Sequence, residues 1–194
     1  MPEGARRPGR PRSRQADQAI LAAALDLLAE CGPEVLGIEQ VAARAGVGKA
    51  TIYRRWPGKE EMLIDALDQV RTQLPEPQGR SVRADLIAVL SAIWRDAADR
   101  RRARLFVLLQ GESARYPRLA AHYLQTVVQP RLNLMSSILR RGVATGELRE
   151  NTDVEAATFL LHGAALASMY GPGLTDVRYA RRAVQELLRG LAAR

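Results

Sequence analysis

The sequence predicts an all-α protein of about nine helices, with a small N-terminal helical domain and a larger C-terminal one. Apolar residues recur three or four positions apart along most of the 194 residues, and no segment alternates apolar and polar side chains as a half-buried strand would. Glycine and proline fall between these periodic segments, where helices end. The segments that follow residues 75–79 are longer than those before, which favours two domains.

Four short helices are expected in the first part of the chain. Their apolar stripes predict helices over residues 17–31, 38–45, 49–56 and 59–70. Gly32-Pro33 ends the first, Gly46 the second and Pro57-Gly58 the third. The fourth stops before Pro75, because the next five residues contain two prolines and have the polar composition of a linker.

Five longer helices are expected after the linker. They are predicted over residues 82–97 with Ser81 as N-cap, around 105–109 and closed near Tyr116, over 117–141 with a kink at Pro130, over 154–170 behind a capping box at 152–155, and over 179–191 behind Thr175 or Asp176. The helix over 154–170 is apolar nearly all round, so it must be covered on two sides. The predicted units are a basic flexible arm (1–16), an N-terminal domain (17–74), a linker (75–80) and a C-terminal domain (81–194).

Composition favours a polyanionic partner and disfavours catalysis. The formal net charge is +8, and residues 4–16 and 44–59 contain basic residues but no acid. A single cysteine and two histidines, with no triad, paired carboxylates or metal-ligand spacing, predict neither an enzyme nor a metal or cofactor site. No signal peptide and no apolar stretch of about 20 residues is present, so we expect a cytoplasmic protein without a membrane partner.

Residues 38–56 have the spacing of a helix-turn-helix motif, with a glycine-containing turn between two short helices. The second helix buries Ile52 and Trp56. The side chains expected to point away from that buried face are Lys49, Ala50, Tyr53 and Arg54. The end of such a helix can enter the major groove of DNA, although the same pattern also fits a three-helix hairpin with a solvated basic face. A phosphate-binding P-loop does not fit, because Ala50 follows Lys49 where that pattern requires Ser or Thr.

Residues 20–70 resemble the DNA-binding domain of the tetracycline-repressor (TetR) family, most closely over residues 38–59, IEQVAARAGVGKATIYRRWPGK. The resemblance implies that Lys49 and Ala50 lie at base edges, Thr51 and Tyr53 on the DNA backbone with Tyr53 also near a thymine methyl, and Lys59 on a phosphate. We add Arg54 and Arg55 to these DNA-binding candidates because they share the same acid-free window. The chain departs from the family at Gly37 and Gly48, since helix starts there often carry a Thr or Ser cap.

Arg10 and Arg12 lie in the stiff, basic arm and are predicted to enter an electronegative minor groove. The alternative is a tail that attracts polyanions without selectivity. Cys31 is interpreted as a small core residue, and the arginines at 100–102 and 104 as a solvated corner.

The resemblance further implies a ligand cavity among the fifth to eighth helices and a dimeric four-helix bundle made by the eighth and ninth. Candidate pocket residues on the expected inner faces are Trp94, Phe106, His122, Tyr123, Met135, Phe159, His162 and Met169. Most residues of this kind on inner faces are simply packed core. His162 stands out because a buried imidazole needs a partner, which a neighbouring carbonyl could also supply. The expected dimer contacts combine a strip of small residues with leucines of the last helix: Gly163, Ala164, Ala167, Leu187 and Leu191.

These features together predict a homodimeric transcription regulator, interpreted as a repressor that a small-molecule ligand releases from a palindromic operator. Its expected partners are double-stranded DNA with an inverted repeat, a second copy of the chain and an effector that the sequence does not identify. The alternative is a basic helical module that coats nucleic acid without ligand switching. A preferred inverted-repeat site would distinguish the two.

Overall fold

The structure, a computed structural model, describes residues 14–167 and 177–191, and no β-strand forms within these ranges. The helices are α1 (Arg14–Val35), α2 (Ile38–Ala45), α3 (Lys49–Tyr53), α4 (Lys59–Leu67), α5 (Val82–Ala98), α6 (Arg100–Gly111), α7 (Pro117–Tyr123), α8 (Gln129–Ala144), α9 (Val154–Ala167) and α10 (Val177–Leu191). A 3₁₀ turn, η1 (Asp68–Val70), extends α4, and a π-helical turn, η2 (Leu124–Val128), joins α7 to α8. The predicted all-α class is confirmed.

Two helix boundaries show how glycine and proline act in this chain. Gly32 adopts φ 80 and ψ 170 within α1, so the regular helix breaks where the sequence predicts its end. The predicted kink near Pro130 takes the form of η2, the wider π turn immediately before α8. Proline cannot donate the backbone hydrogen bond of a regular turn, and a π turn accommodates that loss.

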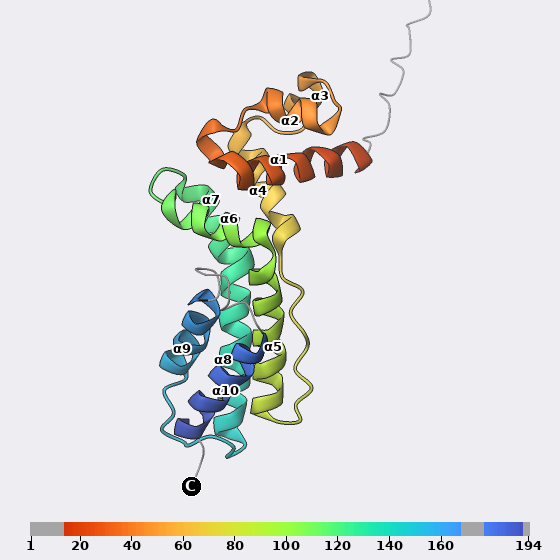
Figure 1. Cartoon of the computed structure of the whole chain (residues 1–194). Coiled ribbons are helices and arrows are strands. Elements are labelled where there is room, and N and C mark those ends of the chain that lie inside the picture. The colour runs from red at the N-terminus through yellow and green to blue at the C-terminus, as the bar shows by residue number, and fades with distance from the viewer. Residues whose placement is uncertain (1–13, 168–176, 192–194) are drawn as a thin grey trace, which may run out of the picture.

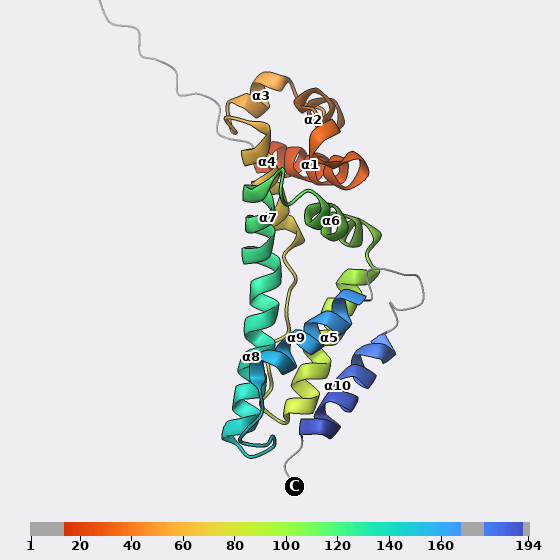
Figure 2. The same ribbon diagram turned by 90° about the vertical axis from the view of Figure 1, so that its left-hand side faces the viewer.

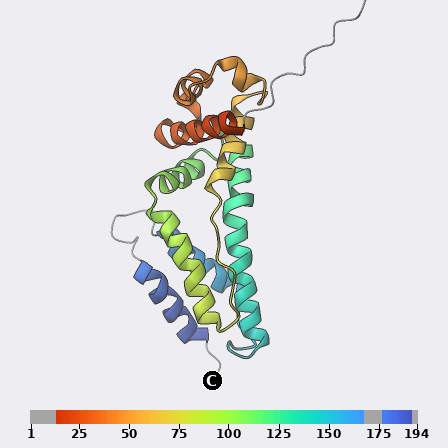
Figure 3. The ribbon, with the colours of Figure 1, turned by 90° about the vertical axis from the view of Figure 1, so that its right-hand side faces the viewer.

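The helices are arranged in an N-terminal group and an elongated bundle, with α6 and α7 between them (Figure 1). Helices α1–α4 gather at one end, and α5, α8, α9 and α10 form the bundle that extends from it (Figure 2). The extended segment 71–80 runs along this bundle between α5 and α8 (Figure 3). It returns the chain from the end of α4 to the start of α5, at the far end of the bundle.

Buried apolar side chains form two clusters. The first combines α1–α4 with residues of α6 and α7, including Leu105, Phe106 and Leu119. The second lies within the bundle of α5, α8, α9 and α10 and includes Leu86, Leu90 and Met135. By packing, therefore, α6 and α7 belong with the N-terminal helices, although they follow the linker in the sequence.

Hydrogen bonds hold the linker in place. The Gln78 and Gly79 amides donate to the Asp85 carboxylate at 2.9 and 3.1 Å, and Arg141 donates to it at 2.6 Å. Burial alone would raise the pKa of Asp85, but these donors outweigh it and lower that pKa. The predicted linker is thus an ordered, extended segment that lies along the bundle.

No helix in the described parts of the chain is long and apolar enough to cross a membrane.

Candidate nucleic-acid interface and its coupling to the C-terminal helices

Backbone hydrogen bonds form the turn between α2 and α3. Gly46 has the left-handed conformation φ 66, ψ 33, which favours glycine. Its N–H donates to the Ala43 carbonyl at 3.3 Å, and the Val47 N–H donates to the Ala42 carbonyl at 3.0 Å. This pair of bonds is a Schellman motif, which ends one helix and redirects the chain into the next.

Neither short helix begins with a side-chain cap. Gly37 precedes α2 and Gly48 precedes α3, as the departure from the TetR pattern predicts. At α2 the Gln40 side chain compensates in part by accepting a hydrogen bond from the Gly37 N–H at 2.8 Å. At α3 no side chain accepts a hydrogen bond from the first backbone N–H groups. A DNA phosphate near the start of α3 could accept from them.

One face of α3 is buried and the other is exposed, as predicted. Ile52 is fully buried, and Trp56 is buried and donates from Nε1 to Asp65 at 2.7 Å. Lys49, Ala50, Tyr53 and Arg54 are exposed, and Thr51 is half-buried. Figure 1 shows α3 at the extremity of the N-terminal group, away from the bundle. The arrangement presents this face to a large external partner.

Lys49 is not an isolated cation. Its Nζ lies 2.6 Å from Oε1 of Glu39 on α2, and both side chains are more than half exposed. The hydrogen bond from Lys49 lowers the pKa of Glu39. Arg54, by contrast, forms no ion pair with any described residue. Sequence reasoning missed Glu39, although Glu39 and Lys49 lie on either side of the turn, at positions that a helix-turn-helix brings close together.

Two of the predicted DNA-binding cations have structural contacts. The Arg55 side chain is only 9% exposed, pairs with Asp17 of α1 and donates to the Thr51 carbonyl at 2.8 Å. Lys59 donates from Nζ to the carbonyls of Pro33, Leu36 and Glu34 at 2.7, 3.0 and 3.4 Å. Its three N–H bonds thus satisfy backbone acceptors where α1 breaks. These contacts give both residues a role in holding the domain together, and their contact with DNA stays a prediction.

Arg10 and Arg12 of the arm and Met169 of the predicted pocket lie outside the described residues. Their assignments stay predictions.

Ion pairs connect α6 and α7 to the N-terminal helices. The interpretation of residues 100–104 as a solvated corner is wrong for Arg101 and Arg102, which reach across to other elements. The ion pairs are Arg101–Asp26 at 2.6 Å, Arg115–Glu34 at 2.7 Å, and Arg118 with Glu60 and Glu61 at 3.0 Å. A hydrogen bond of 2.9 Å also joins His122 Nε2 and Asp68 Oδ1. The N-terminal helices therefore rest on α6 and α7 through both apolar and charged contacts.

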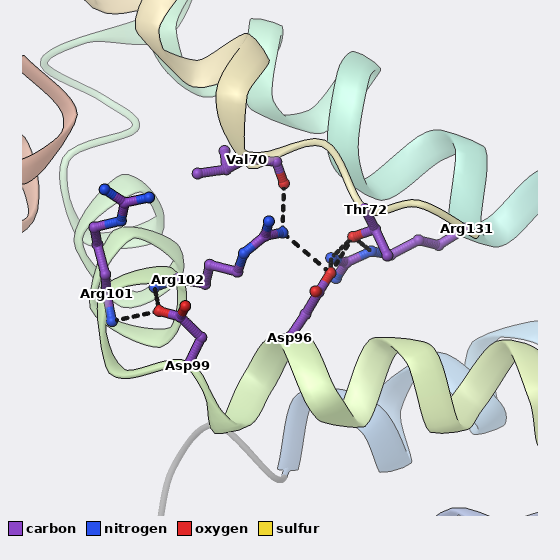
Figure 4. Close-up of polar contacts among 7 residues, drawn as sticks. All are labelled: Val70, Thr72, Asp96, Asp99, Arg101, Arg102 and Arg131. Atoms are coloured by element: carbon purple, nitrogen blue, oxygen red, sulfur yellow. Dashed lines mark hydrogen bonds and ion pairs between the residues drawn. The ribbon is translucent and has the colours of Figure 1, made fainter. Parts of the chain in front are cut away.

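A polar cluster around the buried Arg131 lies where α5, α6 and α8 meet the segment that follows η1 (Figure 4). We call Thr72, Asp96, Arg102 and Arg131 the Arg131 cluster. Asp96 pairs with Arg131 at 3.0 Å and with Arg102 at 3.3 Å, and Thr72 donates to Asp96 and accepts from Arg131. Arg102 also donates to the Val70 carbonyl at 2.8 Å, at the end of η1. The cluster thus joins α5, α6 and α8 to the segment that leaves α4.

Arg131 is 3% exposed, and burial lowers the pKa of its guanidinium. Sequence reasoning missed it, although a signal was present. Arg131 stands four residues before Met135 and seven before Ile138, in register with the apolar stripe of α8. A charged residue in such a stripe needs buried partners, and Asp96 and Thr72 supply them.

The predicted pocket residues do not share one cavity in this structure. Phe106 packs in the N-terminal core and Met135 in the bundle core, while His122 pairs with Asp68. Tyr123 lines a cavity of about 10 Å³ beside the Arg131 cluster. Trp94 lies at a cleft of about 350 Å³ between α5, α9 and α10, together with Ala164 and Ala167.

Two candidate pocket residues on α9, His162 and Phe159, differ in burial. His162 is 8% exposed, and its Nδ1 is buried without a hydrogen-bond partner. Burial, assisted by the charge of Arg131, lowers the pKa of His162 to about 4. The inward direction predicted for Phe159 is wrong, because this side chain is 56% exposed.

An exposed apolar stripe runs along α9. Its large members, Phe159 and Leu160, are 56% and 64% exposed. The other exposed members are small: Ala156, Gly163 and Ala167. Of the predicted dimer contacts, Gly163 and Ala167 lie in this stripe, Ala164 is half-buried, and Leu187 and Leu191 pack partly against the bundle core. The spacing of three and four residues gives the stripe one continuous face of the helix.

No three His, Cys, Asp or Glu side chains within residues 14–167 and 177–191 are grouped so that they could hold a metal ion.

Both parts of the chain match models of one protein family. Residues 20–66 match the family model described as bacterial regulatory proteins, tetR family. Residues 76–187 match the model described as tetracyclin repressor-like, C-terminal domain. The HTH-type transcriptional regulator YdeS of Bacillus subtilis (strain 168) is 32% identical over 188 residues, which cover 95% of this chain and 94% of that protein.

Solved structures share the fold. A TetR-family transcriptional regulator from Mesorhizobium loti MAFF303099 superposes with a TM-score of 0.72 at 19% identity, over 95% of this chain and 100% of that one. The transcriptional regulator FadR from Bacillus subtilis, in complex with stearoyl-CoA, superposes with a TM-score of 0.73 at 23% identity, over 89% of this chain and 98% of that one.

Proposed function

This chain belongs to the tetR family of bacterial regulatory proteins, and from that premise we propose that it is a homodimeric repressor that a small-molecule effector releases from an inverted-repeat operator. The observation that carries the proposal is the exposed face of α3, where Lys49, Ala50, Tyr53 and Arg54 stand over the buried Ile52 and Trp56. A helix held by its apolar face and open along its polar one can read the major groove.

Base reading is assigned to the start of α3. Lys49 and Ala50 occupy its first two positions, so their side chains would approach base edges. Tyr53, 55% exposed, and Arg54 follow within the next turn and would contact the backbone. The remaining proposed contacts are Thr51, Arg55, Lys59 and the arm residues Arg10 and Arg12.

The apolar stripe of α9 supports dimerisation. Phe159 and Leu160 are large apolar side chains in water, and two copies of this stripe would bury each other. Helices α9 and α10 are the eighth and ninth helices of the sequence-based prediction. Two-fold pairing places two α3 helices on one side of the dimer, so the operator should be an inverted repeat.

The ion pairs of α6 and α7 support a ligand-driven switch. Arg118 binds Glu60 and Glu61 at the start of α4, so a shift of α7 would tilt α4 and the helices packed on it. An effector acts only through its preference for one of two such arrangements. The FadR neighbour, solved with stearoyl-CoA, supports a small-molecule site in this fold.

The test is selection of bound duplexes from random DNA with the full chain, followed by footprinting. We expect an enriched inverted repeat whose half-site centres lie about one helical turn apart. Direct repeats would contradict two-fold docking. Binding without any enriched sequence would favour the alternative, a basic module that coats nucleic acid.

A further inference from the structure

We propose that the cleft beside Trp94 receives Leu160 of a second copy of the chain, so that two copies pair in one fixed antiparallel register. In this register Arg182 of each copy faces Glu186 of the other across the two-fold axis. The inference deepens the proposed function and rests on it, since it names the contacts by which the homodimer forms. It depends on a cleft, an exposed leucine and two opposite charges, which α9 and α10 bring together.

The cleft lies between α9 and α10, which run side by side along the bundle (Figure 2). Its volume is about 350 Å³. The indole of Trp94 and the small side chains of Ala164, Ala167 and Ala183 give it an apolar lining. These small side chains leave a hollow that the single chain does not fill. Apolar surface in contact with water favours association, so the cleft suits an apolar side chain from outside.

Leu160 is the large apolar side chain on the same flank of α9 as the cleft. It is 64% exposed, so the single chain gives it little to pack against. Leu160 lies one turn before Ala164 and two turns before Ala167, and these two alanines line the cleft beside α10. Phe159 lies about 100° around the helix axis, on the other flank of the apolar stripe. Leu160 is therefore the residue that a second copy can receive on the α10 side.

Two-fold symmetry determines what Leu160 meets. A two-fold interface uses the same patch on both copies, so the α10 side of α9 meets the α10 side of the partner's α9. Gly163 marks the crossing point, because a Cβ built on it meets no neighbouring side chain within 4 Å and the missing side chain lets two backbones approach closely. With the crossing at Gly163, Leu160 comes opposite residues 166–167 of the second copy, where Ala167 lines the cleft.

The charges beside the cleft complement themselves in the same arrangement. Arg182 and Glu186 stand one turn apart on α10, and both line the cleft. The Arg182 guanidinium lies over the Tyr179 ring, 5.8 Å from its centroid, and forms no ion pair with any described residue. Antiparallel pairing of two α10 helices at this level sets each Arg182 against the partner's Glu186. Sliding one copy by a turn would bring the two Arg182 side chains together, so their repulsion disfavours that register.

The dissociation constant of the dimer, measured by sedimentation of the full chain over a dilution series, tests the apolar contact. Leu160→Ala should raise it by about a hundredfold or more, because the dimer loses two buried leucines. Ala167→Leu should raise it as well, since the added side chain obstructs the incoming Leu160. The variant with both substitutions should recover at least about tenfold relative to the weaker single variant, because total volume at each contact is restored. Phe159→Ala combined with Ala167→Leu is the matched control and should show no recovery.

Charge reversal tests the polar contact. Arg182→Glu and Glu186→Arg should each raise the dissociation constant by about tenfold, because each sets like charges against one another across the axis. The variant with both substitutions should bind as tightly as the natural chain, since the reversed pair is again complementary. Arg189→Gln is the control: it removes the pair that Glu186 makes within its own chain at 2.8 Å and should leave the dimer unchanged. If Ala167→Leu fails to fold, these exposed positions still decide.

Selection of bound duplexes is carried out in parallel, so that this inference and the proposed function can fail separately. A dimer that selects an inverted repeat but is unaffected by Leu160→Ala would overturn the register and leave the homodimeric repressor in place. The cleft would then be open to another occupant, such as a small molecule. Double variants weaker than both of their single variants would also overturn the register. Recovery in both double variants without any enriched operator would support the register and contradict the repressor.

Discussion

Lys49 and Glu39 form an ion pair on the surface assigned to DNA, with Nζ and Oε1 2.6 Å apart. The two residues belong to successive helices of the helix-turn-helix, so the pair spans its turn. Exposed pairs of this kind add little to stability, because water and salt screen them. The consequence is electrostatic: Glu39 neutralises the first cation of α3 and places a carboxylate where phosphates would approach.

Replacement of this carboxylate should strengthen DNA binding in general. In Glu39→Gln, Lys49 is freed and a repulsive charge is removed, so affinity for all duplexes should rise. The slope of log affinity against log salt should steepen by about one counterion. Titrations of operator and unrelated DNA at several salt concentrations measure both quantities. Glu150→Gln, exposed at the far end of the bundle, is the control and should change neither.

Substitutions of Lys49 and Lys59 should affect different properties, the first base specificity and the second the stability of the fold. Lys49→Ala should relax base preference at one half-site position by about 1–3 kcal/mol, since base-edge contacts carry specificity. The same change should alter the free energy of unfolding by less than about 0.5 kcal/mol, because Lys49 is exposed.

Lys59→Ala should have the opposite profile. The loss of three donors to the carbonyls of Pro33, Glu34 and Leu36 should lower the free energy of unfolding by about 1–3 kcal/mol. Urea unfolding of both variants, beside their operator affinities, gives the comparison. If Lys59→Ala instead keeps full stability and weakens binding to all sequences alike, the phosphate contact implied by the TetR resemblance is its main role.

Local sequence patterns predicted the fold and one face of the candidate interface. Apolar periodicity, Gly46 and Pro57-Gly58 specify α2, α3 and the turn between them, because short-range geometry alone decides which side of such helices is buried. The exposure of Lys49 and Tyr53 follows from the burial of Ile52. The same logic failed for Phe159, since a helix that is apolar all round gives no period from which to choose its inner side.

Local sequence patterns could not predict which residues distant in the sequence pair with the charged side chains. Arg55 and Lys59 belong to a basic window, and their contacts with Asp17 and Pro33 join segments that only the folded chain brings together. The pairing of Arg131 with Asp96 likewise depends on how α8 crosses α5. A sequence pattern shows that a charge must find a partner, but tertiary packing decides which one.

The stripe on α9 should control the oligomeric state. Phe159→Glu and Leu160→Glu alter side chains that are exposed within the single chain, so folding should persist while dimerisation is lost. Ala164→Glu, at a half-buried position, should also give a monomer or an aggregate with lost operator affinity, because a charge there would lack a partner. Light scattering measures the mass of each variant.

A matched control for the stripe lies on another helix. Val107 of α6 is 49% exposed, and Val107→Glu should leave the dimer intact. If Phe159→Glu and Leu160→Glu still form stable dimers, with the same mass as the dimer of the unaltered protein, α9 is not the interface.

His162 should make the protein less stable in acid. Its pKa is about 4 in the folded chain, against an ordinary value of 6.5 that an unfolded chain restores. Between these values the unfolded chain binds a proton that the folded one does not, so the contribution is fully present above pH 6.5 and is lost as the pH falls toward 4. The loss should amount to about 3 kcal/mol at most.

The difference between the natural chain and His162→Leu isolates this contribution, because carboxylates titrate in both proteins. Urea unfolding at pH 7 and near pH 4.5 should show that the natural chain loses more free energy of unfolding than the variant over that interval. Parallel pH profiles for the two chains would instead mean that the imidazole finds a hydrogen-bond partner or reaches water in solution, and would contradict an unpaired Nδ1.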